Sequence, residues 1–200
     1  MVNHFYFKDR DGQTPLPAEL RKGLIPKTIQ SVGELDEYEE ENIARGLVWL
    51  EDYSHDDYLT ASFWLKLHKK LFGKVWKWAG KVRTHELDNP DFLQPHQIWE
   101  GFKNLENDLT YWFQHSSFPE LEIAARLHER IETIHPFPNG NGRFGRIITE
   151  YVCQRRGIQV PTWGQSLKDQ PQARRNAYIH ALNQARTTRK YNQLQAFMYS

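Results

Sequence analysis

The stretch that decides the fold runs from Ile134 to Arg146 and reads I-H-P-F-P-N-G-N-G-R-F-G-R. It places one imidazole, two carboxamides, three glycines and two guanidiniums within thirteen positions. Such a mixture has no obvious use in an apolar core. The stretch therefore predicts a functional loop between two structural elements.

Apolar residues on both sides of this loop recur at every third or fourth position, which is typical of helices. Pro136 disfavours helical geometry at the residue before it, so the first helix should end at His135. The glycine-rich run 138–142 should then lead into a second helix. The positions that carry the pattern are Ile123, Leu127, Ile131 and Ile134 before the loop, and Phe144, Ile147, Ile148, Tyr151 and Val152 after it.

The start of the second helix has the composition of an anion-binding site. Free amides and the helix dipole attract phosphate oxygens there, and Gly140 and Gly142 allow a close backbone approach. Arg143 and Arg146 are three positions apart, so we expect them to project to one side and hold phosphate oxygens. Each residue alone has a common structural explanation, since glycines are frequent in loops and surface arginines are usually solvated. Their joint occurrence favours a phosphate site, because the dipole disfavours cations at a helix start.

The run H-P-F-x-x-G-N-G-R-x-x-R resembles the signature of the Fic family, most of whose members transfer the AMP part of ATP to a hydroxyl side chain of another protein. Within that family the chain is most similar to the branch called mobile mystery protein B. The further motifs that resemble this branch are D-G-x-T-P-L at 11–16, G-L-I-P at 23–26, E-N-I at 41–43, V-W-x-W-A-G-K-x-R-T at 75–84 and L-H-E-R at 127–130.

The resemblance implies a role for each residue of the loop. His135 is expected to be the general base that takes the proton of a target Ser, Thr or Tyr hydroxyl, since an imidazole exchanges protons near neutral pH. Phe137 is expected to anchor the loop. The expected nucleotide-binding residues are Asn139, Gly140, Asn141, Gly142, Arg143 and Arg146.

Position 139 departs from the general Fic pattern, which has Asp or Glu there as the ligand of Mg²⁺. Asn139 can offer magnesium a carboxamide oxygen but no charge, and magnesium favours carboxylates and phosphates. We therefore expect Mg²⁺ as the cofactor, with lower affinity unless ATP supplies most of the ligands.

Residues 81–93 are the place where strands are expected, because Val82, Thr84 and Leu87 suit extended chain and 88–90 reads as a turn. The resemblance implies that this hairpin is a flap that holds the target by strand addition, with Glu86 and Leu87 as target-binding residues. Without the resemblance, a plain surface hairpin would be the preferred interpretation.

Two hundred residues of ordinary composition fit one domain, so we expect a single Fic-type domain over 1–200, all-α apart from the hairpin, with an irregular N-terminal segment at 1–30. A mean hydropathy of −0.75 and the lack of an apolar run exclude a membrane span, and no signal peptide is recognisable, so a cytoplasmic protein is expected. Cys153 lies among apolar helix positions and is expected to be structural. Besides the two helices that flank the loop, helices are expected near 32–50, 59–71, 98–113, 178–185 and 194–198.

The net charge of +1 hides an asymmetry between the two ends of the chain. From Asn141 onward, ten Lys and Arg residues face two acids, whereas Glu34 to Asp57 holds ten acids and one base. The basic end suits a nucleoside triphosphate and would equally suit nucleic acid, although much of it could be solvated helix surface. The acidic run is expected to be a solvated helix face, with attraction of a basic partner as the alternative.

Two further motifs are excluded. His128-Glu129 begins like the zinc motif H-E-x-x-H, but Glu132 stands where the second His is required, so His128 is expected to be a hydrogen-bonded structural residue. The inhibitory Fic motif S/T-x-x-x-E-G/N is also missing, because Glu41-Asn42 is preceded by Glu37 where Ser or Thr is needed. Inhibition in cis is therefore not expected.

The leading hypothesis is a protein adenylyltransferase that acts on an unknown target protein. The resemblance further implies the toxin-like half of a two-gene module, restrained in trans by a small helix-turn-helix partner. The alternatives are a Fic scaffold with weak or different activity, including another nucleotide or phosphate donor, and a nucleotide- or nucleic-acid-binding module. A membrane partner is excluded and a nucleic-acid partner is not expected.

Overall fold

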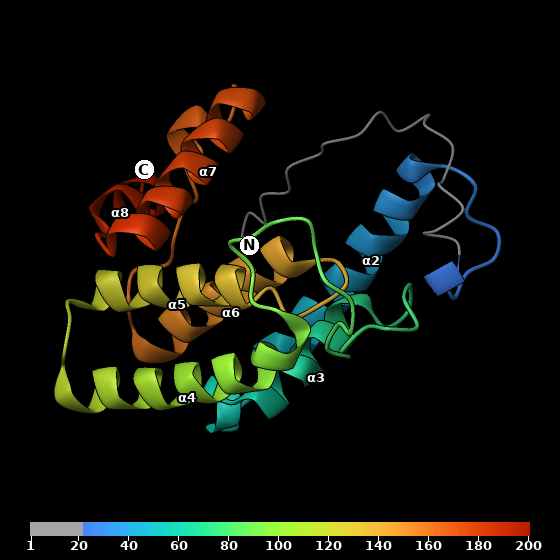
Figure 1. The fold of residues 1–200 in the computed structure, drawn as a ribbon. Helices are drawn as coiled ribbons and strands as arrows, with labels where there is room; N and C mark the ends of the chain where they lie inside the picture. The colour runs from blue at the N-terminus through green and yellow to red at the C-terminus, as the bar shows by residue number, and fades with distance from the viewer. Residues whose placement is uncertain (1–21) are drawn as a thin grey trace. The chain divides into compact units, whose positions relative to one another are not determined.

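The computed structural model describes residues 22–200, and the regular secondary structure of these residues is almost entirely helical (Figure 1). The all-α class expected from the sequence is confirmed. The described chain divides into two compact units. We call residues 22–84 with Phe137–Gly140 the N-terminal unit, and His85–Pro136 with Asn141–Ser200 the C-terminal unit.

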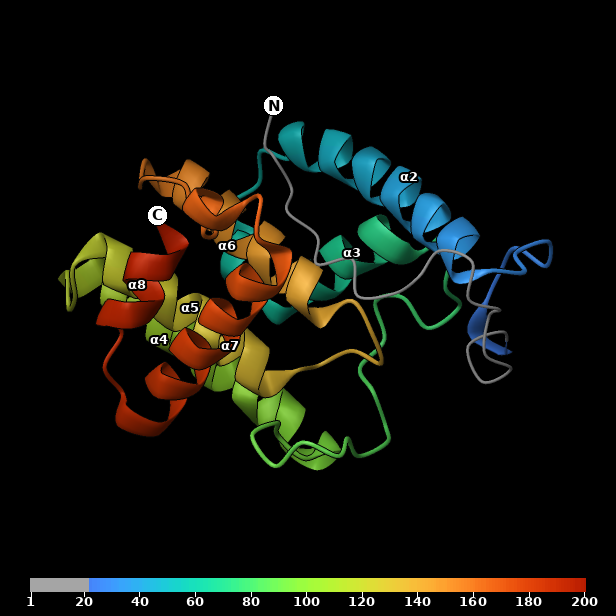
Figure 2. The same ribbon diagram turned by 90° about the horizontal axis from the view of Figure 1, so that it is seen from above.

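The N-terminal unit is built on two packed helices, α2 (Val32–Glu51) and α3 (Ala61–Phe72), which lie side by side in Figure 2. A capping box starts α2, because the Glu34 N–H donates to the Ser31 Oγ while the Glu34 carboxylate accepts the Ser31 N–H. The Thr60 side chain caps α3 by accepting the Phe63 N–H. A short 3₁₀ helix, η1 (Asp57–Leu59), precedes α3. The fully buried core includes Leu24, Ile43, Phe63, Trp64, Leu67, Leu71, Phe72, Val75, Trp76 and Phe137.

The C-terminal unit is arranged around α5 (Glu120–Ile134), which contacts α4 (Ile98–His115), α6 (Asn141–Arg156), α7 (Pro171–Thr188) and α8 (Asn192–Met198). Two 3₁₀ helices, η2 (Pro95–Gln97) and η3 (Gln165–Leu167), lie before α4 and α7. Buried side chains of α5 include Ala124, Ala125, Leu127 and Ile131. This central position fixes α5, and with it the start of the loop at His135.

The loop between α5 and α6 is shorter than the sequence predicts. The helix α6 begins at Asn141, so Asn141 and Gly142 belong to its first turn rather than to the loop. The other helices expected from the apolar spacing are confirmed, with α7 starting seven residues before the expected Tyr178. Apolar periodicity marks only the buried face of a helix, so a helix start that has no buried apolar residue and no side-chain cap is not predicted.

The predicted hairpin at 81–93 is wrong. No residue of this segment belongs to a strand, and the isolated antiparallel bridge found among residues 22–200 joins Leu24 to Trp76. The Asn89 side chain accepts the Asp91 N–H, and the Asn89 carbonyl accepts the Phe92 N–H, so these donors are used within a turn. Pro90 has no N–H to offer a ladder. The segment therefore forms a turn, and its backbone bond to another element is the one from the Leu93 N–H to the Thr133 carbonyl of α5.

The predicted N-terminal segment at 1–30 lies mostly outside the described residues, as does the motif at 11–16. Its described part joins the N-terminal unit through backbone bonds from Ile25 to Val75 and from Lys77 to Gly23. Within residues 22–200, no helix has the length and apolar character needed to cross a bilayer.

Candidate active site

His135 follows the last residue of α5, as the sequence predicts. Its backbone is in the left-handed region, with φ 45° and ψ 57°, and its N–H donates to the Ile131 carbonyl. The His135 Nδ1 lies 3.3 Å from the carbonyl oxygen of Glu132. A carbonyl can only accept, so Nδ1 carries the hydrogen and Nε2 is the basic nitrogen of the neutral ring. This tautomer is the one that a general base acting through Nε2 requires.

The ring of His135 is also held from outside α5. Phe92 stacks on it, with ring centroids 3.8 Å apart and 13° between the planes. The backbone next to Phe92 is fastened to the same helix end, because the Leu93 N–H donates to the Thr133 carbonyl at 3.0 Å. This contact could not be predicted, since nothing in the sequence pairs Phe92 with a residue 43 positions later.

The first turn of α6 carries the predicted anion site of the C-terminal unit. Asn141 is buried, whereas Gly142 and Arg143 are half-buried. A Cβ built on Gly142 would meet one neighbouring atom, Nη1 of Arg146, at 3.6 Å. Arg146 thus turns its guanidinium back toward the start of its own helix, as side chains on a helix tend to do.

Arg146 is more buried than its predicted partner Arg143, which is half-buried. The Arg146 side chain is 6% exposed. Burial raises the pKa of Glu132 on α5 and of Tyr178 on α7, and the charge of Arg146 opposes both rises. The body of Arg146 therefore belongs to a buried polar cluster, while its Nη1 atom lies near Gly142.

Glu132 is the carboxylate at the centre of this cluster. Burial raises its pKa from 4.5 to about 7, although the charges of Arg146 and Arg186 oppose the rise. Its Oε1 atom has no hydrogen-bond partner among the described residues. Gly145 of α6 packs against this oxygen so closely that a Cβ at position 145 would overlap it. Glycine at 145 therefore leaves room for the Glu132 carboxylate, which would have to move to accept a larger residue.

His128 is a structural residue, as expected. It is fully buried, and its Nε2 lies 3.0 Å from the hydroxyl of Tyr178. Burial, together with the charge of Arg146, lowers the pKa of His128 from 6.5 to about 3, so its ring is neutral at physiological pH. Cys153 is buried as well, and burial raises the pKa of its thiol to about 12. Neither group is placed for chemistry on a ligand.

In the N-terminal unit, His68 of α3 holds the middle of the loop. The Gly80 N–H donates to His68 Nδ1, so the hydrogen is on Nε2, which donates to the Asn139 carbonyl at 3.1 Å. The His68 ring also stacks on Phe137, with centroids 3.6 Å apart. Phe137 is fully buried, so its expected role as an anchor is confirmed. His68 itself was missed, because no local motif marks it.

Gly140 needs its glycine for two reasons. Its φ is +79°, and a Cβ would lie 2.8 Å from the ring of Phe72. The half-buried Asn139 side chain turns back into the loop, where its Oδ1 accepts the Gly140 N–H at 2.7 Å. This neutral oxygen, already hydrogen-bonded, does not fit a magnesium ligand as it is arranged. Residues 22–200 also hold no group of three His, Cys, Asp or Glu that could bind a metal.

The predicted target-binding residues lie on the irregular segment that replaces the hairpin. Glu86 is exposed and Leu87 is half-buried. No residue of this segment belongs to a strand, so the segment has no strand edge to which a target chain could add.

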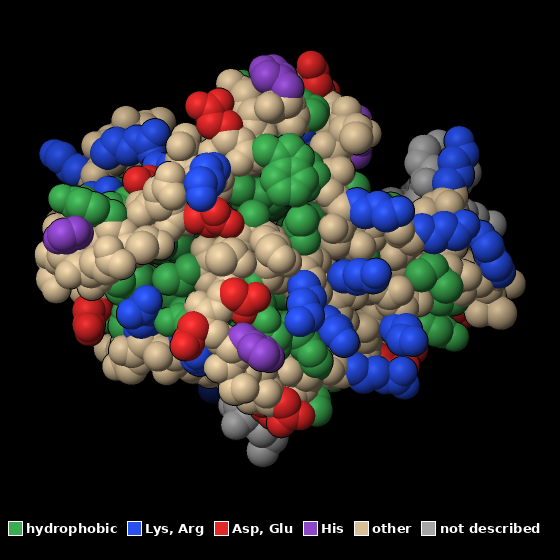
Figure 3. Space-filling view, turned by 90° about the horizontal axis from the view of Figure 1, so that it is seen from below, with side chains coloured by type: hydrophobic (Ala, Val, Ile, Leu, Met, Phe, Trp, Pro, Cys, Tyr) green, Lys and Arg blue, Asp and Glu red, His purple; other side chains and the backbone are tan. Residues whose placement is uncertain are grey.

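The basic residues near the C-terminus are less available than their number suggests. Arg146 and Arg174 are buried, and the Arg186 side chain is 10% exposed. Figure 3 shows Lys and Arg side chains gathered on one part of the drawn face. The exposed lysines on α3 and directly after it are Lys66, Lys69, Lys70, Lys74, Lys77 and Lys81.

Residues 58–153, from η1 to α6, match the model of the Fic/DOC family. These residues of the chain are thus similar to the Fic/DOC family. The relationship expected from the loop motif is confirmed, whereas the branch within the family stays a prediction.

Relatives that are named for an activity match part of the chain. Protein adenylyltransferase VbhT of Bartonella schoenbuchensis is 34% identical over 100 residues, which are 48% of this chain and 21% of that protein. A uridine 5′-monophosphate transferase of Xanthomonas campestris is 34% identical over 55 residues, covering 24% of this chain and 10% of that protein. The chain therefore spans a small part of the length of these relatives.

The fold has close counterparts among solved structures. The crystal structure of BepC, a VirB-translocated effector of Bartonella tribocorum with bound AMPPNP, gives a TM-score of 0.68 at 20% identity. The match covers 98% of this chain and 94% of that one. At this identity the likeness establishes the Fic fold.

Proposed function

We propose that this Fic protein is a protein adenylyltransferase, which moves AMP from ATP to a Ser, Thr or Tyr hydroxyl of another protein. The observation that carries the proposal is the placement of His135 after the end of α5, with Nδ1–H directed to the Glu132 carbonyl and Nε2 as the basic nitrogen. The similarity to VbhT, which is named as a protein adenylyltransferase, supports the same activity.

In the proposed reaction, His135 Nε2 takes the proton of the target hydroxyl. The hydroxyl oxygen forms a bond to the α-phosphorus of ATP, and the bond from that phosphorus to the bridging oxygen breaks. The electron pair of the broken bond leaves with pyrophosphate. A positioned general base of this kind typically contributes about 10²- to 10⁴-fold to a rate.

The first turn of α6 is proposed to bind the phosphates. The backbone N–H groups of a helix start and the helix dipole favour an anion. At Gly142 even an added Cβ would lie an ordinary 3.6 Å from Arg146 Nη1, so the backbone there is open to a close approach. Arg143 is proposed to clamp the outer phosphates and Arg146 the γ-phosphate. Asn139, Gly140 and Asn141 are proposed to complete the cradle through the loop.

Magnesium is proposed to be held mainly by oxygens of the nucleotide, where its charge would stabilise the leaving pyrophosphate. The Asn139 side chain in its present arrangement does not provide a ligand, because its Oδ1 accepts the Gly140 N–H. We assign no step of the reaction to the metal.

The choice of nucleotide and of the transferred group can be tested together. The pure protein is incubated with a cell lysate and with ATP, GTP, CTP or UTP that is labelled on the α-phosphate or on the γ-phosphate. Transfer of AMP labels protein from α-labelled ATP and leaves γ-labelled ATP without effect. Label from UTP would favour the activity named for the Xanthomonas relative, and label from the γ-phosphate would contradict nucleotidyl transfer.

We further propose that the protein belongs to the mobile mystery protein B branch, as the toxin-like half of a two-gene module. The motifs at 23–26, 41–43 and 75–84 support this. Because the chain lacks the usual inhibitory motif, restraint would come in trans from a helix-turn-helix partner. Labelling by the chain alone, compared with the chain co-expressed with the protein encoded beside it, tests the restraint.

The rival function, a silent scaffold or a nucleic-acid-binding module, has less support. A binding module has no need for an imidazole oriented as His135 is. Three of the C-terminal guanidiniums lie inside the C-terminal unit, which reduces the basic surface that nucleic acid could use there. Salt-dependent binding of DNA or RNA by a protein that labels nothing would favour the rival.

A further inference from the structure

We infer that Arg186, at the C-terminal end of α7, is a positioning residue for His135, and that it acts through Phe92. This inference rests on the proposed role of His135 as general base. Arg186 touches neither the His135 ring nor the first turn of α6 in any contact described above. It contacts the two parts of the protein that orient the His135 ring, which are the end of α5 and the turn that carries Phe92.

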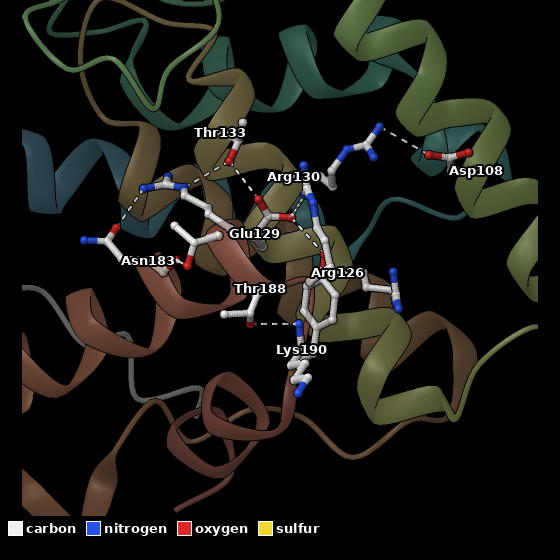
Figure 4. Close-up of polar contacts among 12 residues, drawn as sticks. Asp108, Arg126, Glu129, Arg130, Thr133, Asn183, Thr188 and Lys190 are labelled. Carbon is white, nitrogen blue, oxygen red and sulfur yellow. Dashed lines mark hydrogen bonds and ion pairs between the residues drawn. The ribbon is translucent and has the colours of Figure 1, made fainter.

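The first feature is the end of α5. Arg186 donates from Nε to the hydroxyl of Thr133 at 3.0 Å, and the same hydroxyl donates to Glu129 Oε1 at 2.8 Å (Figure 4). Glu129 is fully buried, and Tyr191 donates to its other oxygen. The Thr133 side chain is therefore fixed in one rotamer by a donor and an acceptor.

The second feature is the turn that carries Phe92. The Arg186 guanidinium lies 5.6 Å from the centre of the Phe92 ring, within the range of a cation–π contact. Its Nη1 is 3.9 Å from Asp91 Oδ2. The Thr133 carbonyl completes the attachment by accepting the Leu93 N–H. Arg186 and Thr133 together thus fasten three consecutive residues of an otherwise irregular segment.

Burial of the charged Arg186 side chain costs stability. Its side chain is 10% exposed, and its Nη2 atom has no hydrogen-bond partner among residues 22–200. A buried donor of a charged group that lacks a partner destabilises the fold. A fold that needed only to join α7 to α5 could do so with an apolar side chain. The guanidinium is explained by what it holds, since an apolar side chain could not bond Thr133 and face Asp91.

The consequence concerns the imidazole. Phe92 lies flat on His135 only while its turn is fastened, and the turn has few other bonds. Loss of Arg186 should let Phe92 leave the stack and the His135 ring rotate about its side-chain bonds. A small misplacement of a reacting group can lower a rate by about a hundredfold.

The test reads the His135 ring directly by NMR, with histidine-labelled protein and without nucleotide. Protons over the face of an aromatic ring are shifted upfield, so the stacked His135 ring should show upfield protons in the parent. The signals are assigned by their loss in His135→Ala. Phe92→Leu sets the size of the shift that the stack produces.

We expect Arg186→Gln to remove at least half of the shift that Phe92→Leu removes, and Arg186→Lys to remove less. The matched control is Lys190→Gln, four residues further along, which removes a positive charge from an exposed side chain. The control should leave the His135 signals in place. In labelling assays, Arg186→Gln should lower kcat and leave the KM for the nucleotide unchanged.

An unchanged His135 shift in Arg186→Gln, with a moved one in Phe92→Leu, would overturn the inference. An unmoved shift in Phe92→Leu would overturn it as well. If Arg186→Gln does not fold, Arg186→Lys is used instead: a smaller loss of the shift is expected there, and a His135 shift equal to that of the parent would overturn the inference. Because the shift needs no transfer, it is measured even in a protein that labels no target, so failure of the inference is distinct from failure of the proposed function.

Discussion

The ring of Phe92 lies nearly parallel to the imidazole of His135, with centroids 3.8 Å apart and planes 13° apart. One face of the proposed base is thereby covered by a residue from the segment before α4, while the Glu132 carbonyl of α5 accepts from its Nδ1. The ring is held by two segments that are distant in sequence. Orientation before the substrate arrives lowers the entropy cost of the proton transfer.

The phosphate site at the start of α6 predicts a loss of nucleotide affinity in Arg143→Ala. Charge-assisted hydrogen bonds contribute about 1.5 to 3 kcal/mol, so affinity should fall by about tenfold or more. Calorimetry with a non-hydrolysable ATP analogue measures the change. Arg156→Ala, an exposed position at the other end of the same helix, is the control and should bind like the parent. Equal affinities in both variants would rule out Arg143 as a phosphate ligand.

Asn139→Asp tests the metal. The substitution adds a charge next to the nucleotide, so it should lower the magnesium concentration needed for half-maximal labelling. The Asn139 side chain must first release the Gly140 N–H, which is a small cost beside the gain of a carboxylate ligand. A magnesium titration of both proteins measures the effect. A drop in activity at every magnesium concentration would mean that the carboxylate repels the phosphates, and labelling without magnesium would refute the metal role.

The end of α5 and the first residues of the loop could be predicted from the sequence, because local rules determine their structure. The end of α5 follows from Pro136, and the buried Phe137 follows from the motif. The hairpin failed for a local reason too, since Asn89 and Pro90 form a turn in place of a ladder. The predicted start of α6 was wrong because glycine is typical of loops, whereas the helix already includes Gly142.

Burial of Glu132 predicts a pH-dependent contribution to stability. Its pKa is raised from 4.5 to about 7, so the folded protein binds the proton more tightly than the unfolded one. This contribution is fully present below pH 4.5 and is lost as the pH rises toward 7, by on the order of 3 kcal/mol. Glu132→Gln cannot titrate there. The stability of the variant relative to the parent should therefore rise between pH 4.5 and 7.5.

Urea unfolding of both proteins across that range measures the difference, in which the contributions of the other buried groups cancel. The exposed Glu100→Gln on α4 serves as control and should show no such trend. A relative stability of Glu132→Gln that does not change with pH would show that folding does not raise the pKa of Glu132.

The crossing of α5 and α6 predicts that Gly145→Ala destabilises the protein. The added methyl group would overlap Glu132 Oε1, and overpacking of a buried site typically costs about 1 to 3 kcal/mol. Gly142→Ala is the matched control on the same helix, because its Cβ would meet Arg146 Nη1 at an ordinary 3.6 Å. Thermal unfolding compares the two. Melting temperatures that fall equally would contradict the close packing at position 145.

The contacts that the sequence could not predict are those between distant segments. His68 reaches Asn139 across 71 positions, and Phe92 and Arg186 reach the end of α5 from opposite sides in sequence. Each is an aromatic or charged residue at an unremarkable position. Their roles depend on which helices pack together, and a single sequence does not report that.

The central claim is that His135 is the base of an adenylyl transfer, and the most direct measurement compares His135→Ala with the parent. Both proteins are incubated with α-phosphate-labelled ATP and a cell lysate, and calorimetry measures their affinity for the ATP analogue. A base acts in the transition state, so the variant should bind the analogue as the parent does and label no protein. Labelling of the same targets by His135→Ala at the rate of the parent would contradict the claim.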